Sequence, residues 1–280
     1  MNKIIKLTLC PQNIDIINNT DCEGVEIQLI GDEDFSLFDG IKKKLVTIHY
    51  PLATDVVSEV EEEMFTDLFQ ILKNRKNHLK SICAVAEKHH CGIVVHSYLN
   101  WLRINSENYD YENFIADLKE IHNEYPHVKL CVENTGTLSY SERFDIFTRA
   151  EDIPRMLRRI NADIGYELCH PLLDITHYYM EFSSEVWNHF HYSLAETIEL
   201  YKSSYQCIHF NYGLGDCNGK RHSKNFDTNP KLLDELLRAI KVINENAYLI
   251  LEICEDDYDN RPEMFKLLED IQKWEKGEFK

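Results

Sequence analysis

Eight short apolar runs, rich in β-branched residues, recur along the chain with helix-like sequence between them. Each run is bounded by polar or turn residues, as expected of strands. The runs are nearly continuous in apolar character rather than alternating, which is typical of parallel strands covered on both faces. They span residues 4–10, 24–30, 45–50, 92–98, 128–134, 164 to about 174, 205–211 and 247–253.

Amphipathic stretches of helical periodicity lie between these runs. They cover residues 56–89, 111–125, 141–160, 184–201 and 231–244, and the stretch 262–274 closes the chain. Strands that alternate with helices in this way predict an α/β fold, a (β/α)8 TIM barrel, which uses about 250 residues. No Pro/Gly/Ser-rich linker interrupts the pattern, so we expect one domain over residues 1–280. Pro171 interrupts the sixth run, whose strand ends either at His170 or at Asp174.

The composition narrows the classes of function. Hydrophobic residues make up 44% of the chain and charged residues 28%, which suits a globular protein with a large core. No apolar run approaches the roughly 20 residues that span a bilayer, and the opening residues lack a signal peptide, so we expect a cytoplasmic protein without a membrane partner. The net charge of −18 disfavours nucleic acid as a partner. The nine cysteines form no CxxC pair, which indicates reduced thiols.

The residues that could carry chemistry stand where the apolar runs end. In a TIM barrel the carboxyl ends of the strands surround one mouth, where the active site lies. Six successive runs carry a histidine or a carboxylate at or near their carboxyl end: His49, His96, Glu133, Asp174, His209 and Glu252. His177 follows Asp174 by three residues, and His222 stands in the segment after the seventh run.

A bound divalent metal is the simplest reason for this repetition. Uncompensated imidazoles and carboxylates are costly to desolvate in a shared mouth, and packing does not require them at the same position in each unit. Any one of them alone could be a structural group, such as a helix cap. A mixed nitrogen and oxygen set suits Zn²⁺ or Mn²⁺, and iron is also accommodated.

These motifs resemble the xylose isomerase-like TIM barrels, a superfamily that holds sugar phosphate isomerases and epimerases and the endonuclease IV type of AP endonuclease family 2. The likeness rests on Ile48-His49-Tyr50-Pro51, Val94-Val95-His96, Val132-Glu133-Asn134-Thr135, Asp174-Ile175-Thr176-His177, Ile208-His209-Phe210-Asn211, Arg221-His222 and Leu251-Glu252. In the isomerases and epimerases, the resemblance implies a metal held by Glu133, Asp174, His209 and Glu252. Glu133 and Glu252 are then the catalytic residues that move a proton on the substrate.

The endonuclease type implies a larger cluster of metals, to which His49, His96, His177 and His222 would also contribute. That family has Asp-x-His before the last histidine, whereas this chain has Lys220-Arg221-His222. A charged lysine is no metal ligand, so we expect two metals, or a third that binds weakly, within an overall range of about one to three per chain. The basic residues Lys220, Arg221 and Lys224 are the expected binding site for a substrate phosphate.

Three functions follow, in order of preference. The first is metal-dependent isomerisation or epimerisation of a sugar, sugar phosphate or related polyol, because that ligand set is complete. The second is multi-metal hydrolysis of a phosphoester, which the additional histidines favour. The third is an iron-dependent oxidative enzyme or a metal-binding barrel without catalysis. The expected partner is a small sugar or phosphoester rather than nucleic acid.

Overall fold

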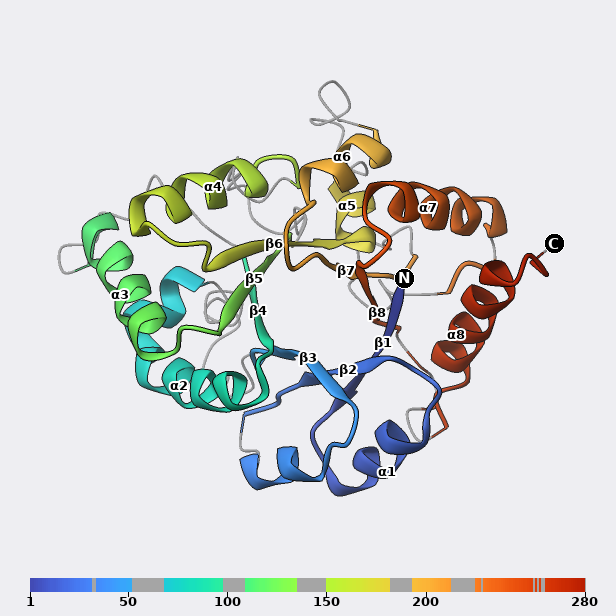
Figure 1. The fold of residues 1–280 in the computed structure, drawn as a ribbon, viewed down its shortest axis with the longest axis horizontal. Helices are drawn as coiled ribbons and strands as arrows, with labels where there is room; N and C mark the ends of the chain where they lie inside the picture. The colour runs from blue at the N-terminus through green and yellow to red at the C-terminus, as the bar shows by residue number, and fades with distance from the viewer. Residues whose placement is uncertain are drawn as a thin grey trace.

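Eight parallel strands form a closed barrel in sequence order, and helices surround it (Figure 1). The computed structural model describes residues 1–31, 34–51, 68–97, 109–134, 150–181, 193–212, 225–227, 229–253, 255, 257 and 260–279. The strands are β1 (Asn2–Thr8), β2 (Gly24–Gln28), β3 (Lys44–His49), β4 (Gly92–His96), β5 (Lys129–Glu133), β6 (Cys169–Asp174), β7 (Cys207–His209) and β8 (Tyr248–Leu251). The predicted (β/α)8 barrel is therefore confirmed.

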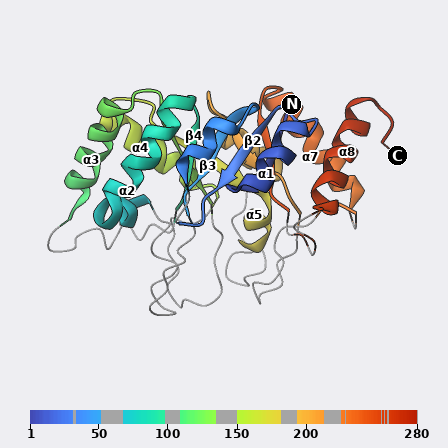
Figure 2. The same cartoon turned by 90° about the horizontal axis from the view of Figure 1, so that it is seen from below.

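The helices form a ring outside the strands, and α5 lies at the end of the barrel where the strands finish (Figure 2). The helices are α1 (Pro11–Asn19), α2 (Leu68–His89), α3 (Tyr111–Glu124), α4 (Ile153–Ile164), α5 (Ile175–Glu181), α6 (Leu194–Leu200), α7 (Pro230–Ile243) and α8 (Pro262–Glu275), with a 3-10 helix η1 (Phe35–Gly40). The predicted stretches 111–125, 231–244 and 262–274 match α3, α7 and α8 closely. The stretches 56–67, 141–149 and 184–192 lie outside the described residues.

The sixth strand ends at Asp174, which decides between the two predicted ends. The predicted start of the run at residue 164 is wrong, because α4 continues to Ile164 and ends at Gly165 in the left-handed conformation (φ 86°). Pro171 lies inside the strand. The carbonyl of Leu172 accepts a hydrogen bond from Asn134 N, directly after β5, so the backbone of Leu172 faces β5 and that of Pro171 faces β7. The pairing of β6 with β7 begins only at Leu172. Pro171 therefore needs no N–H at that position.

An apolar layer fills the barrel below the strand ends. Its buried members are Ile4, Val46, Val94, Cys131, Leu172, Tyr205, Cys207 and Ile250. The hydroxyl of Tyr205 donates to the carbonyl of Val46 and accepts a hydrogen bond from Gly92 N (3.3 Å). A barrel interior packed in this way is a core rather than a channel, so the polar groups above it open to one end only.

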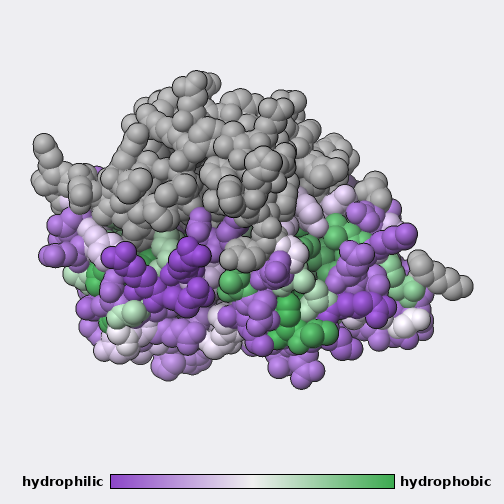
Figure 3. Space-filling model, turned by 90° about the horizontal axis from the view of Figure 1, so that it is seen from above, coloured by the Kyte–Doolittle hydropathy of each residue, from purple (hydrophilic) through white to green (hydrophobic). Residues whose placement is uncertain are grey.

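The described surface is mostly hydrophilic on the face shown in Figure 3, with smaller apolar areas. No described helix has the length and apolar character needed to cross a membrane. The seven described cysteines form no disulfide with one another, and six of them are buried.

Gly92→Ala tests the packing of this interior. A Cβ at this position would lie 2.9 Å from Tyr205 Cε1, closer than Cβ atoms approach other atoms in proteins, and only 3.0 Å from Cys131 Sγ. We expect a loss of about 1–3 kcal/mol in the free energy of unfolding, measured with urea. Gly40→Ala is the control, because its Cβ would meet only the Ile14 side chain at 3.4 Å. Equal stability of both variants would contradict the packing described.

Candidate metal centre

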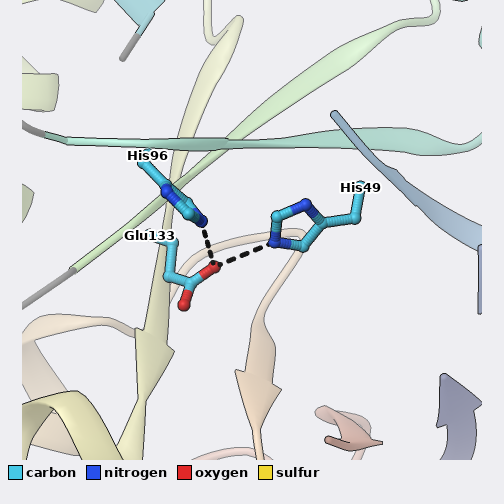
Figure 4. A group of neighbouring side chains, drawn as sticks. All are labelled: His49, His96 and Glu133. Atoms are coloured by element: carbon cyan, nitrogen blue, oxygen red, sulfur yellow. Dashed lines mark ion pairs between the residues drawn. The ribbon is translucent and has the colours of Figure 1, made fainter. Parts of the chain in front are cut away.

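Three neighbouring strands bring His49, His96 and Glu133 together at their carboxyl ends. Strand β4 pairs with β5 so that His96 lies opposite Glu133, and His49 ends β3 on the other side of β4. The Nε2 atoms of His49 and His96 lie 3.4 Å and 3.6 Å from the same oxygen, Glu133 Oε2 (Figure 4). One potential ligand atom from each residue lies within 4.8 Å of the others. A single cation could therefore be held by all three.

A second group shares Glu133 with the first. It consists of Glu133, Asp174, His209 and Glu252, whose potential ligand atoms also lie within 4.8 Å of one another. His209 Nδ1 lies 2.6 Å from Glu252 Oε2, 3.4 Å from Glu133 Oε1 and 3.7 Å from Asp174 Oδ2. Because Glu133 presents Oε2 to the first group and Oε1 to the second, its carboxylate lies between two potential metal positions.

The two groups concentrate charge where little water reaches. Glu133 and Asp174 are buried, and the Glu252 side chain is one quarter exposed. Burial alone would raise the pKa of Glu133, but His209, His177 and His49 hold it well below its usual range. Burial raises the pKa of Asp174, with Glu133 and Glu252 adding to the effect. Burial lowers the pKa of His96 to about 3, which leaves this imidazole neutral and able to act as a ligand.

Asp174 is held in place from both of its oxygens. Oδ1 accepts a hydrogen bond from His177 N (2.6 Å) and so caps the start of α5. Oδ2 accepts from Asn211 Nδ2 (2.9 Å), and Asn211 Oδ1 in turn accepts from Thr176 N (2.9 Å). The side chain of Asn134 holds the backbone of Asp174, because its Oδ1 accepts a hydrogen bond from Asp174 N (2.6 Å). This network fixes the direction in which Oδ2 faces His209.

Hydrogen bonds also orient two of the histidines. His49 Nδ1 lies 2.9 Å from the carbonyl of Tyr50, so it donates there and leaves Nε2 toward Glu133. His177 Nδ1 lies 2.8 Å from the carbonyl of Asn134 and 3.1 Å from Glu133 Oε1. His177 thus lies beside the two groups without being a member of either, and its predicted role as a ligand stays a prediction.

Several buried atoms of the two groups make no hydrogen bond. Glu133 Oε2, His209 Nδ1 and Glu252 Oε2 are enclosed without a partner of hydrogen-bond geometry, although they lie within ion-pair distances of their neighbours. Leaving such atoms unpaired costs free energy, and a divalent cation removes that cost by accepting their lone pairs. The nitrogen and oxygen donors suit zinc or manganese. The residues present therefore fit a metal.

The sequence interpretation missed two charged residues of this site. Lys6 on β1 and Glu26 on β2 lie among the candidate ligands, and Glu26 contacts His209. The available signal was a single charged residue inside each of the first two apolar runs. The predicted residues Lys220, Arg221, His222 and Lys224 lie outside the described residues, so their roles stay predictions.

No protein-family model and no curated protein matches the chain. Solved structures do match its fold. An AP endonuclease of family 2 from Brucella melitensis is 13% identical over 92% of this chain and 95% of its own, with a TM-score of 0.58. Endonuclease IV from Thermus thermophilus is 14% identical over 99% and 100% of the two chains, with a TM-score of 0.56. D-allulose 3-epimerase from Methylomonas sp. is 12% identical over 97% and 98%, with a TM-score of 0.57.

These neighbours are enzymes, and the predicted resemblance to them is confirmed at the level of the fold. They include both a family of endonucleases and an epimerase. A shared fold at such low identity does not select one reaction, because function resides in the site that the fold carries.

Asn211→Ala tests the support of Asp174. Without the Nδ2 donor, Asp174 Oδ2 is free to turn, so we expect affinity for Zn²⁺ to fall about 10- to 100-fold in a chelator competition. Asn161→Ala is the matched control, because Asn161 makes a similar pair of hydrogen bonds to Cys169 at the other end of β6. If the two variants bind zinc equally well, Asn211 has no role in the site.

Proposed function

We propose that the chain is a metal-dependent phosphoester hydrolase with a two-metal centre. The observation that supports this most is the position of Glu133 in both ligand groups. Isomerases need only the second group, so His49 and His96 would have no chemical role in that reaction. Two metal positions that share one carboxylate are the arrangement used to hold both the attacking and the leaving oxygen of a displacement.

The chain's own residues would hold the two cations and direct the substrate. His49, His96 and Glu133 Oε2 form one position, and Glu133 Oε1 joins Asp174, His209 and Glu252 at the other. When bound, divalent cations supply Lewis acidity that activates water and stabilises charge on phosphoryl oxygens. The apolar layer beneath the strand ends confines the reaction to the open end of the barrel. Lys220, Arg221 and Lys224 remain the proposed contacts for a phosphate.

Sugar isomerisation or epimerisation is the second candidate. The complete group of Glu133, Asp174, His209 and Glu252 favours it, because it places two glutamates beside one metal position, where they can move a proton on a neighbouring carbon. The two proposals differ in what they require of His49. Hydrolysis needs it, whereas isomerisation does not.

Metal content measured on the purified protein separates these proposals. We expect about two divalent cations per chain in the wild type and about one in His49→Ala, because the second group keeps all four of its ligands. Elemental analysis after gel filtration provides the count, and circular dichroism verifies that the variant is folded. His127→Ala is the control, since this exposed histidine lies beside Glu87 on the surface. A count of about one cation per chain in both the wild type and His49→Ala would favour the isomerase.

Activity provides the second test. A panel of aryl phosphate mono- and diesters, an abasic-site oligonucleotide, and ketose and aldose sugars with their phosphates is offered to the wild type and to His96→Ala. We expect phosphoester hydrolysis in the wild type and a loss of at least about 100-fold in the variant. Sugar turnover that survives in His96→Ala, with no phosphoester cleaved, would overturn the hydrolase proposal. Cleavage of the oligonucleotide alone would identify nucleic acid as the substrate despite the acidic net charge.

A further inference from the structure

The first two strands carry a buried ion pair into the layer of candidate ligands. Lys6 and Glu26 are Cα partners in the register of β1 and β2, and Lys6 Nζ lies 3.2 Å from Glu26 Oε1. The Lys6 side chain is 9% exposed and the Glu26 side chain is fully enclosed. Taking both charges out of water costs about as much as their attraction returns, so such a pair contributes little to stability. We therefore expect a role of the Lys6–Glu26 pair among the neighbouring candidate ligands.

Lys6 also contacts one oxygen of a candidate ligand. Its Nζ lies 2.8 Å from Glu252 Oε1, while Glu252 Oε2 lies 2.6 Å from His209 Nδ1. The ammonium group therefore occupies one carboxylate oxygen and leaves the other facing the second group. A carboxylate held in this way presents a single oxygen to a cation.

Glu26 acts on the opposite side of the same histidine. Its Oε1 lies 3.2 Å from His209 Nε2, and its Oε2 accepts a hydrogen bond from Thr47 Oγ1 at 2.6 Å. With Nε2 beside Glu26, Nδ1 is the ring nitrogen that faces Glu133, Asp174 and Glu252. Thr47, from β3, keeps Glu26 in this position.

We propose that Lys6 and Glu26 form a positioning pair that selectively strengthens one of the two metal positions. Both ligands that the pair contacts, Glu252 and His209, belong to the second group, and neither belongs to the group of His49, His96 and Glu133. The pair fixes which atom of Glu252 and of His209 faces the cation. The second position therefore binds a cation more tightly than it would without the pair, whereas the first position is unaffected. This inference rests on the proposed two-metal function and deepens it.

The test uses the double variant Lys6→Met/Glu26→Gln, made in the wild type and in His49→Ala. Replacing both charges avoids an unpaired buried ion, so we expect the free energy of unfolding of the metal-depleted protein to change little. The folded protein is then dialysed against increasing chelator, and retained zinc is counted by elemental analysis. In His49→Ala, where only the second position remains, we expect the double substitution to weaken zinc retention about 10- to 100-fold.

A spectroscopic readout separates positioning from a general loss of structure. Co²⁺ replaces the zinc, and its visible absorption reports the ligand geometry of each position. We expect the double variant to alter the band that persists in His49→Ala and to leave unchanged the band that His49→Ala removes. Lys3→Met/Glu275→Gln is the matched control, because Lys3 lies on the same strand, is also 9% exposed and forms a 2.8 Å ion pair with Glu275. The control should retain zinc as the wild type does.

Equal zinc retention with and without the double substitution in His49→Ala would overturn the inference. So would an equal weakening of both positions, since that would indicate a general effect of charge. A wild type that binds no zinc would overturn it as well. The proposed function fails differently: zinc binding that follows the expected pattern, in a protein that cleaves no phosphoester, would reject the hydrolase and leave the positioning pair in place.

Discussion

The buried carboxylate of Glu133 is the group on which the arrangement of the site depends. An ionised carboxylate away from water is tolerated only when opposite charges or hydrogen-bond donors surround it. Here His177 and His209 lie 3.1 Å and 3.4 Å from Oε1. His49 and His96 lie 3.4 Å and 3.6 Å from Oε2, where a bound cation would supply the opposite charge. Those contacts require β3, β4, β5 and β7 to end at the same level around one mouth. The register of the closed barrel supplies this condition, because His96 lies opposite Glu133 and Asp174 opposite His209.

The interior of the barrel separates this polar layer from the solvent at the other end. Beneath the candidate ligands lies the apolar layer that includes Val94, Leu172 and Ile250. Tyr205 extends this layer, and Gly92 makes room for its ring. Because this apolar layer has a low dielectric constant, electrostatic contacts next to it are stronger than in water. The same apolar layer increases the free-energy cost of the oxygens of Glu133 and Glu252 that make no hydrogen bond. A cation bound between them would remove that cost.

The sequence predicted the barrel well because buried parallel strands leave a strong signal. Runs such as 92–98 and 247–253 contain almost only apolar residues, and the strand ends stand out as isolated histidines and carboxylates. Helices with weaker sequence patterns were not predicted. Helix α1 is short and largely polar (PQNIDIINN), and α5 begins directly after Asp174, so neither has the length over which helical periodicity can be recognised. The start of β6 was misplaced because Ile164 to Leu168 contains apolar residues that belong to the end of α4 and the following turn.

The candidate ligands could be predicted, but their supporting groups could not. A ligand at a strand end can be recognised in the sequence because it follows an apolar run. Lys6 and Glu26 instead lie inside apolar runs and resemble ordinary interruptions of the pattern. Their proposed role arises from contacts between segments far apart in the sequence: Lys6 on β1 contacts Glu252 at the end of the neighbouring β8, and Glu26 on β2 contacts His209 on β7. Asn211 is similar, because its amide reaches Asp174 from the neighbouring strand.

The distinction between hydrolysis and isomerisation depends on a small part of this framework. In the two proposals, the group of Glu133, Asp174, His209 and Glu252 would serve either reaction, and it needs only the ends of the last four strands. His49 and His96 would add a second position from β3 and β4 without any change in the barrel. Because Glu133 has two oxygens, one for each group, a second cation requires no further carboxylate. A change of reaction within one fold can therefore follow from two strand-end residues, which explains why likeness in fold alone leaves the chemistry open.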